Sequence, residues 1–391
     1  IYQYKMPFKV YSFGSNGNFQ LGFPHCEDLM VPQLTLSNDT PGVNSELNIA
    51  CNDHIKKVVL GGNHTVILLT SGKILLAGSN EMGQLSGDVN CKAIEKWGVP
   101  DETWLFDDPD EKIVDVTCGW EYTMVLTSTN KVYVRGNGPK GELGIGPQIL
   151  QSHRFLEVLH LEDPRDNIKI FSSFQNCTVL VTNPDKGTKV YGWGSNTKCQ
   201  LRIPKCKIVS IPSIIFEKGG VFIDYISMGK DFMIFVDMEG SIANILGNIP
   251  KTFKWEDWLG KSNLKVLTMW SSMHIIERLP KFHISSYGFN MHKQIFSNEN
   301  IEGLDVKNVT VGSEHGILTN NDGDHISIQC WGWGEHGNCG SLYDDKSKII
   351  NDRSNEISAL NKVFEVSKDS KVNVDIYGGC ANTWIIIDQI D

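Results

Sequence analysis

Two short patterns alternate along the chain, and their repetition limits the fold more than any other feature of the sequence. The first is an apolar stretch that ends in Gly-x-Asn, as in residues 10–16 and 190–196. The second is a strand, a turn and a strand, with the turn six positions after a leading aliphatic residue, as from Ile55 to Gly61. Each pattern occurs seven times. Such self-similarity is typical of a protein built from equivalent structural units.

The copies are spaced like the blades of a propeller. The first-pattern glycines fall about 40 to 65 residues apart, which suits one blade for each interval. We place these glycines at Gly14, Gly78, Gly136, Gly194, Gly247, Gly288 and Gly334. We place the second-pattern turns at Gly61, Gly119, Phe174, Gly229, Trp270, Gly312 and Gly378. The sequence therefore predicts an all-β fold, a seven-bladed β-propeller.

The order of the elements also predicts where the loops lie. In each unit a strand rises to the second-pattern turn, another descends to a tight turn such as Ser71-Gly72, and a third rises to the Gly-x-Asn loop. In such a meander, the second-pattern turn and the Gly-x-Asn loop emerge at the same end. The chain opens with the first pattern and closes with the second, so we expect its first and last strands to pair in one shared blade. Ring closure would hide open strand edges.

We expect residues 6–391 to form one domain, with residues 1–5 a cloning remnant ahead of Met6. Insertions interrupt the repeat at 88–112, 250–262 and 341–371. The first two carry tryptophans that either bind a partner or anchor the loop to the rim. The third is polar, and we predict a mobile loop there. The tryptophans are Trp97, Trp104, Trp255 and Trp258.

Composition argues against several classes of protein. The net charge is −10 and the basic residues are dispersed, which disfavours direct DNA binding. The cysteines occur singly, so we expect no structural zinc site in this chain. No apolar stretch is long enough for a membrane span, and we find no secretory signal, so we expect a cytoplasmic and partly nuclear protein. There is no P-loop, nucleophile elbow or H-E-x-x-H motif, so we expect neither catalysis nor a cofactor of its own.

The best candidates for a binding surface lie at the end shared by the turns and loops. An aromatic residue among mixed charges on a rigid rim suits protein recognition. For any one residue a simple turn role is the plainer alternative, but the face as a whole favours binding. Trp120 is the first choice, because an indole one residue past a turn glycine has little core to enter. The predicted contacts are Asn16, Asn63, Trp120, Glu121, Asn196, Lys230, Asp231, Glu314, His315, Glu335 and His336.

The histidines of this set allow a second interpretation. His64 and His315 occupy a repeating position, so hydrogen bonding between neighbouring turns explains them more simply than catalysis or metal binding does. His336 stands where we expect the asparagine of its loop. Together with Glu335 it raises the alternative of a site shared with a metal carried by a partner.

The segments Gly61 to Thr65 and Val10 to Gly22 resemble the unit of the regulator of chromosome condensation repeat family, and the likeness covers nearly the whole chain. Longer blocks at residues 191–201, 312–319 and 330–340 are similar to a fungal subgroup. The resemblance implies a partner, a small CSL-type zinc protein of the diphthamide pathway that carries zinc or iron. It also implies a role in Elongator-dependent modification of tRNA wobble uridines and in diphthamide synthesis on elongation factor 2.

Two other functions compete with this adaptor role. Some members of the repeat family act as guanine-nucleotide exchange factors for small GTPases, although exchange linked to chromatin would also want a basic tail, which we do not find here. A substrate-binding scaffold for ubiquitin ligation would need a ligase domain that this sequence does not show. We therefore expect a non-catalytic adaptor, with nucleotide exchange as the alternative.

Overall fold

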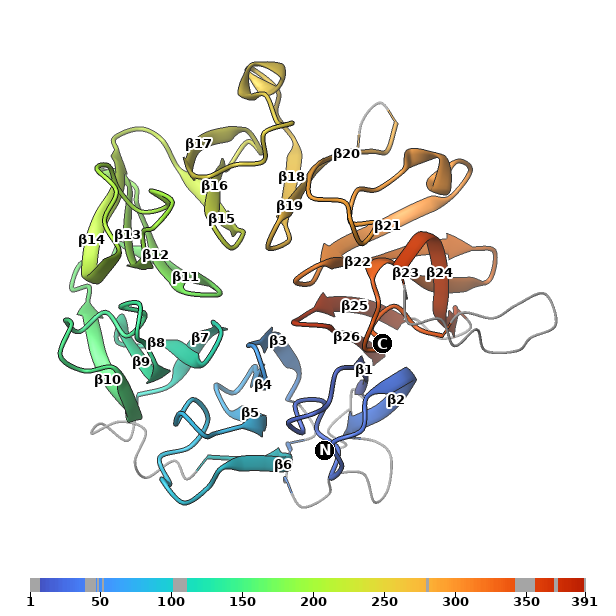
Figure 1. Ribbon diagram of the computed structural model, residues 1–391, viewed down its shortest axis with the longest axis horizontal. Helices are drawn as coiled ribbons and strands as arrows, with labels where there is room; N and C mark the ends of the chain where they lie inside the picture. Colours follow the sequence, from blue (N-terminus) through green and yellow to red (C-terminus); the bar gives the residue numbers. More distant parts are fainter. Residues whose placement is uncertain are drawn as a thin grey trace, which may run out of the picture.

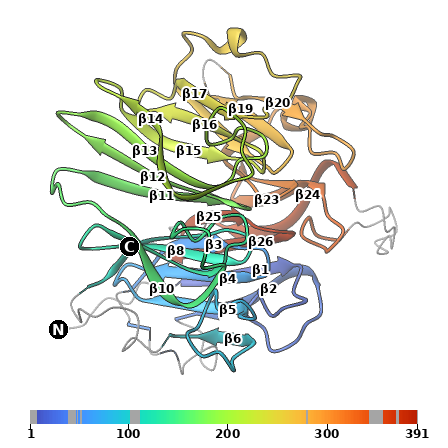
Figure 2. The same ribbon diagram turned by 60° about the vertical axis from the view of Figure 1, so that its left-hand side comes forward.

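Seven antiparallel sheets surround a central axis in the computed structural model of the chain (Figure 1). The structure describes residues 8–38, 47, 49–50, 53–100, 111–278, 281–341, 356–368 and 372–389. In six of the seven blades the strands follow chain order from the axis outward, and the exception is the blade that joins the two ends of the chain. Figure 2 shows this order in two blades, from β3 to β6 and from β11 to β14. The predicted seven-bladed β-propeller is confirmed.

Blade 1 combines the two ends of the chain. Its sheet has the order β2-β1-β26-β25. The first and last parts of the chain meet where β1 pairs with β26, in an unbroken register from Phe8 opposite Asp388 to Gly14 opposite Asn382. The predicted closure of the ring is therefore confirmed. The strands are β1 (Phe8–Gly14), β2 (Leu29–Ser37), β25 (Val372–Gly378) and β26 (Asn382–Gln389).

Four further blades have four strands each. Blade 2 contains β3 (Ile55–Leu60), β4 (His64–Leu69), β5 (Ile74–Ser79) and β6 (Ala93–Gly98). Blade 3 contains β7 (Ile113–Cys118), β8 (Tyr122–Thr127), β9 (Lys131–Asn137) and β10 (Gln151–His160). Blade 4 contains β11 (Asn167–Ser173), β12 (Asn176–Asn183), β13 (Gly187–Ser195) and β14 (Ile208–Lys218). Blade 7 contains β21 (Asp305–Val311), β22 (His315–Asp322), β23 (His325–Trp333) and β24 (Glu356–Ser367).

Blades 5 and 6 have three strands each in the part of the chain that the structure describes. Blade 5 contains β15 (Ile223–Met228), β16 (Phe232–Asp237) and β17 (Ile242–Gly247). Blade 6 contains β18 (Leu264–Thr268), β19 (Ser272–Glu277) and β20 (His283–Gly288). Short 3-10 helices follow them, η3 (Trp255–Trp258) after blade 5 and η4 (Asn298–Ile301) after blade 6.

Two of the three predicted insertions are wrong in part, because they contain strands of the blades. The segment 88–112 holds β6, and 341–371 holds β24. Trp97 on β6 is buried, and its indole Nε1 donates to Thr35 Oγ1 of blade 1 at 3.0 Å, so this tryptophan anchors the segment. Trp258 on η3 is also buried, in the core between blades 5 and 6. Trp104 lies outside the described residues.

One repeated backbone hydrogen bond joins the two patterns in every blade. The residue after the first-pattern glycine donates its N–H to a carbonyl of the second-pattern turn, as from Ser79 to Asn63 at 2.8 Å. The glycines have φ between 92° and 119°, and an added Cβ would lie at most 2.8 Å from the same carbonyl oxygen. Only glycine tolerates both conditions. The seven donor and acceptor pairs are Ser15–Ala381, Ser79–Asn63, Asn137–Glu121, Ser195–Gln175, Asn248–Asp231, Phe289–Ser271 and Trp333–Glu314.

This bond corrects the predicted register in several blades. The blade 7 glycine is Gly332, which pairs with His315, and not Gly334. In blades 4 and 6 the turn begins one residue earlier than predicted, at Ser173 and Met269. The inner strands of blades 2, 3, 5 and 7 each show a register shift that adds one residue before the turn, whereas those of blades 4 and 6 are regular. A fixed spacing therefore misplaced the turns. In blade 1 the turn begins at Gly379 rather than Gly378.

Candidate functional site at the mouth of the central channel

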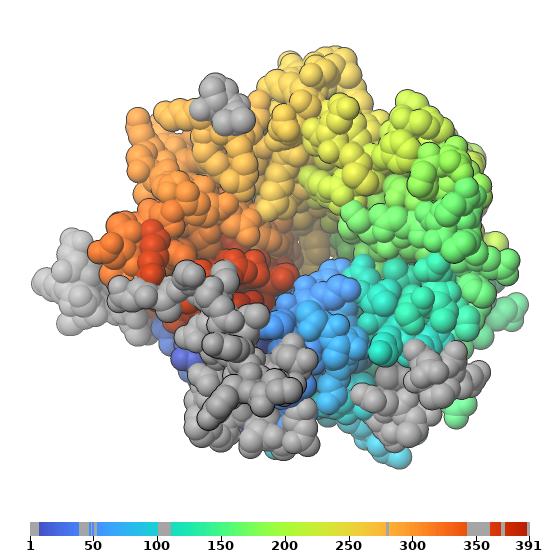
Figure 3. All heavy atoms as spheres, turned by 180° about the vertical axis from the view of Figure 1, so that it is seen from behind, coloured from blue at the N-terminus to red at the C-terminus, as the bar shows by residue number. Residues whose placement is uncertain are grey.

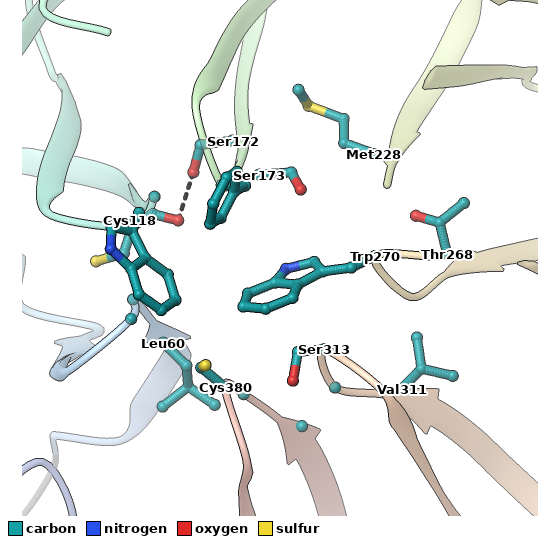
Figure 4. A pocket seen from close by; sticks show the side chains of 18 residues that line it. Leu60, Cys118, Ser172, Ser173, Met228, Thr268, Trp270, Val311, Ser313 and Cys380 are labelled. Atoms are coloured by element: carbon teal, nitrogen blue, oxygen red, sulfur yellow. Dashed lines mark hydrogen bonds between the residues drawn. The ribbon is translucent and has the colours of Figure 1, made fainter. Parts of the chain in front are cut away.

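The second residue of each second-pattern turn lies at one mouth of the central channel, and we call these seven the mouth residues. Six of them line a single cavity of about 160 Å³ (Figure 4). From the side opposite to the view of Figure 1, the surface is hollowed at the centre of the ring (Figure 3). The mouth residues are Gly62, Trp120, Phe174, Lys230, Trp270, Ser313 and Cys380.

Backbone hydrogen bonds between neighbouring blades hold the mouth residues in place. Gly62 N–H donates to the Trp120 carbonyl at 3.0 Å, and Trp120 N–H donates to the Phe174 carbonyl at 2.8 Å. On the other side of the ring, Lys230 N–H donates to the Trp270 carbonyl at 3.1 Å, and Trp270 N–H donates to the Ser313 carbonyl at 2.8 Å. The side chains at the mouth therefore stand on a rigid frame.

Three aromatic rings gather on one side of the mouth, and we call Trp120, Phe174 and Trp270 the aromatic cluster. Their ring centroids are 5.3 to 5.6 Å apart in tilted and edge-to-face arrangements. Lys230 Nζ lies 4.5 Å from the centroid of the Phe174 ring, within cation–π range. The other side of the mouth carries small residues, Gly62, Ser313 and Cys380, which leaves the cavity open beside the rings. All three rings are partly exposed.

The groups around the cavity suit recognition better than nucleophilic chemistry. Burial raises the pKa of Cys118 to about 12 and that of Cys380 to about 11, so both thiols stay protonated near neutral pH. Among the described residues, no group of three His, Cys, Asp or Glu side chains is arranged to hold a metal ion. No helix in the described part of the chain is long and apolar enough to cross a membrane. The mouth offers aromatic surface, indole N–H groups and one ammonium group.

The structure brings most of the predicted turn residues to this end. Trp120 and Lys230 are mouth residues. Asn63, Glu121, Asp231 and Glu314 follow mouth residues directly and are partly exposed. The carboxylates are already engaged in part: Glu121 Oε2 accepts from Asn137 Nδ2 at 2.7 Å, and Glu314 Oε2 accepts from Ser271 Oγ at 2.8 Å. Burial raises the pKa of Glu314 above its usual value.

His315 was predicted as a partner contact, and this is wrong, because the side chain is 1 % exposed. Its Nε2 lies 2.9 Å from Thr383 Oγ1 of blade 1, and His64 Nε2 lies 3.2 Å from Thr123 Oγ1 of blade 3. Burial lowers the pKa of His64 to about 3 and that of His315 to about 4, so both are neutral near pH 7. The simpler interpretation, hydrogen bonding between neighbouring blades, is confirmed.

Asn16 and Asn196 are also wrong as partner contacts, because both are fully buried and build their own loops. Asn16 Oδ1 accepts from Leu21 N–H at 3.0 Å, and Asn196 Oδ1 accepts from Leu201 N–H at 2.8 Å. Four buried glutamines also stabilise these loops, since the side-chain oxygen of each accepts a hydrogen bond from the backbone N–H two residues before it. These are Gln20, Gln84, Gln200 and Gln294. The Gln-Leu segments of the sequence are therefore structural.

His336 does not stand in the asparagine position of its loop, because the blade 7 glycine is Gly332 and Gly334 takes that position. Its Nδ1 lies 2.8 Å from Asp28 Oδ2, so the ring links the loops of blades 7 and 1. Glu335 is exposed on the same loop. These two residues belong to the outer loops and not to the mouth.

Sequence reasoning missed Phe174 and Trp270 as site residues. Both were placed at the glycine of the turn, where they looked like a loss of the pattern. When the predicted register is shifted by one residue, Phe174 and Trp270 each fall at the same repeat position as Trp120. Three aromatic residues at one repeat position would then have been the signal.

The regulator of chromosome condensation (RCC1) repeat matches this chain at residues 9–68, 55–84 and 113–142. An RCC1 repeat-containing protein of Schizosaccharomyces pombe is 25% identical over 97% of this chain and 98% of its own length. The crystal structure of human WBSCR16 has a TM-score of 0.68 at 15% identity, covering 97% of this chain and 98% of that one. Yeast RCC1 (Prp20), solved with Kap60, has a TM-score of 0.53 at 14% identity, covering 99% and 90%. Parts of this chain are therefore similar to the RCC1 repeat, and the solved structures share its propeller fold.

Proposed function

We propose that this chain is a non-catalytic adaptor that binds a protein partner at the channel mouth. The observation that carries the proposal is the aromatic cluster. Three rings at one repeat position are partly exposed on a rigid frame instead of filling the core. Aromatic anchors of this kind supply much of the affinity in protein interfaces.

The finer resemblance of the sequence, to the fungal alpha-tubulin suppressor group, suggests the partner. On this proposal the partner is the small CSL-type zinc protein of the diphthamide pathway, which brings its own zinc or iron. The complex would act, in the cytoplasm and partly in the nucleus, in Elongator-dependent wobble-uridine modification and in diphthamide synthesis. Elongator would be reached through the partner and not by a direct contact.

Co-purification of the two recombinant proteins tests the proposal, followed by titration calorimetry of the complex. We expect a stoichiometric complex that needs no nucleotide. Trp120→Ala should weaken it by at least about 2 kcal/mol, because truncation removes a central anchor. Trp97→Phe is the matched control, since that indole is buried away from the mouth, and it should leave the affinity unchanged. Release of labelled GDP from a small GTPase, without a complex, would favour nucleotide exchange instead.

A further inference from the structure

A groove of about 430 Å³ lies between blades 5 and 6, beside the aromatic cluster. It is lined in part by Lys230, Ile249, Lys251, Trp270 and Phe289. Trp270 lines both the groove and the axial cavity, so the groove adjoins the cavity.

A departure from the repeat lies in the blade 5 loop, part of which lines this groove. Six residues after the first-pattern glycine, six of the seven loops carry a buried polar side chain. The Cβ atoms of Gln200 and Asn338 lie within 3.0 Å of the positions that a Cβ would take at Gly247 and Gly14. Blade 5 instead has Phe253 in that position.

Phe253 is buried, and its ring centroid lies 5.3 Å from that of Tyr287 in blade 6.

The chemistry of the groove is apolar and basic. Trp270 and Ile249 provide apolar surface, and Phe289 is 44% exposed. Lys230 and Lys251 are exposed, and in the described part of the chain neither ammonium group forms an ion pair. Asp231 is the single carboxylate among the described lining residues. A basic groove is unusual on a chain whose net charge is −10.

We propose that the groove binds an extended acidic segment of the protein partner. An apolar side chain of that segment would lie between Trp270 and Phe289, and its carboxylates would pair with Lys230 and Lys251. Lysines that form no ion pair with the described residues, beside exposed aromatic surface, favour such a ligand over a basic one. The proposal rests on the adaptor function above and adds the chemistry that the partner must present.

A synthetic peptide that alternates Glu with Leu and Phe tests the groove, with a peptide that has Lys in place of Glu as its counterpart. Binding is measured by titration calorimetry at two salt concentrations. The acidic peptide should bind the wild-type protein, more weakly at high salt, and the basic peptide should not. The pair Lys230→Glu and Lys251→Glu should weaken binding at least about tenfold, and Lys251→Glu alone should weaken it without touching the aromatic cluster. Lys254→Glu, an exposed lysine outside the groove lining, is the matched control and should change little.

The same variants are then titrated with the recombinant CSL-type protein. Loss of binding in the double variant supports both proposals. If Trp120→Ala weakens the complex while the double variant binds as tightly as the wild type, the groove proposal is overturned and the adaptor function stands. If the acidic peptide binds through the lysines but the CSL-type protein does not bind at all, the groove stands and the proposed partner fails. If the acidic peptide binds neither the wild-type protein nor its lysine variants, the groove proposal is overturned.

Discussion

Replacing Glu142 by glutamine should stabilise the protein above neutral pH and leave it nearly unchanged in acid. Glu142 is 3% exposed and stands in the blade 3 loop at the position that carries a buried glutamine in four other blades. Its Oε2 accepts from the backbone N–H of Lys140 at 2.6 Å, as the glutamines accept in their loops. The amide of a glutamine can make the same bond, so Glu142→Gln removes a charge without removing a contact.

The size of the effect follows from the pKa of this carboxyl group. Burial, with a smaller contribution from nearby Glu121, raises the pKa of Glu142 from 4.5 to about 7. Because the folded state binds the proton more tightly, Glu142 does not lower the free energy of unfolding below pH 4.5. As the pH rises from 4.5 through about 7 the unfolded chain ionises first and stability falls. The difference of about 2.5 pKa units, at 1.36 kcal/mol each, gives a cost of about 3 kcal/mol above pH 7.

Urea unfolding of the wild type and of Glu142→Gln at pH 5 and pH 8 measures this cost. The variant should gain about 3 kcal/mol at pH 8 and less than about 1 kcal/mol at pH 5. Gln84→Glu, the reverse change in blade 2, should lose stability with the same pH dependence. The contributions of the other titrating groups to the free energy of unfolding cancel when two proteins are compared at the same pH. A gain of equal size at both pH values would refute the reasoning, because it could not come from the ionisation of Glu142.

Three further predictions concern the ring. Gly332→Ala should cost roughly 1–3 kcal/mol, since it combines a φ of 98° with a backbone oxygen 2.8 Å away, whereas Gly17→Ala, which meets nothing within 4 Å, should be neutral in the same urea assay. Deletion of residues 375–391 should open the ring and give insoluble protein; a soluble truncation with an unchanged melting temperature would contradict this. His315→Ala should cost about 1–3 kcal/mol, because it leaves the buried Thr383 hydroxyl without that partner. Since the pKa of His315 is about 4 in the fold, the wild type should also lose stability from pH 6.5 down to 4, and the variant should lose less, as thermal melts across that range would show.

The number of blades and the closure of the ring could be predicted from the sequence, because both depend on repeated local patterns. Each glycine of the first pattern is required by its own backbone contact, as at Gly78 beside the Asn63 carbonyl, so the pattern survives where other residues vary. The outer strands β6 and β24 have no such requirement. They were therefore taken for insertions.

The site was only partly predictable for a related reason. Trp120 follows a glycine and was recognised, but Phe174 and Trp270 follow Ser173 and Met269. Whether an inner strand contains a bulge decides the register there, and spacing alone does not reveal it. Burial was also beyond reach: Asn16 and His315 lie in the expected loops and turns, yet their side chains face inward to partners that only the assembled ring supplies.

The pairing of β1 with β26 has a consequence for how the protein is made. Phe8 pairs with Asp388, so blade 1 stays incomplete until residues 9–387 between them have also been synthesised. During that time the apolar side chains of β1 lack their neighbours. Contacts between such distant segments form slowly, and exposed unpaired strands invite aggregation. Biogenesis in the cell should therefore depend on chaperones that shield the first strand until the last one arrives.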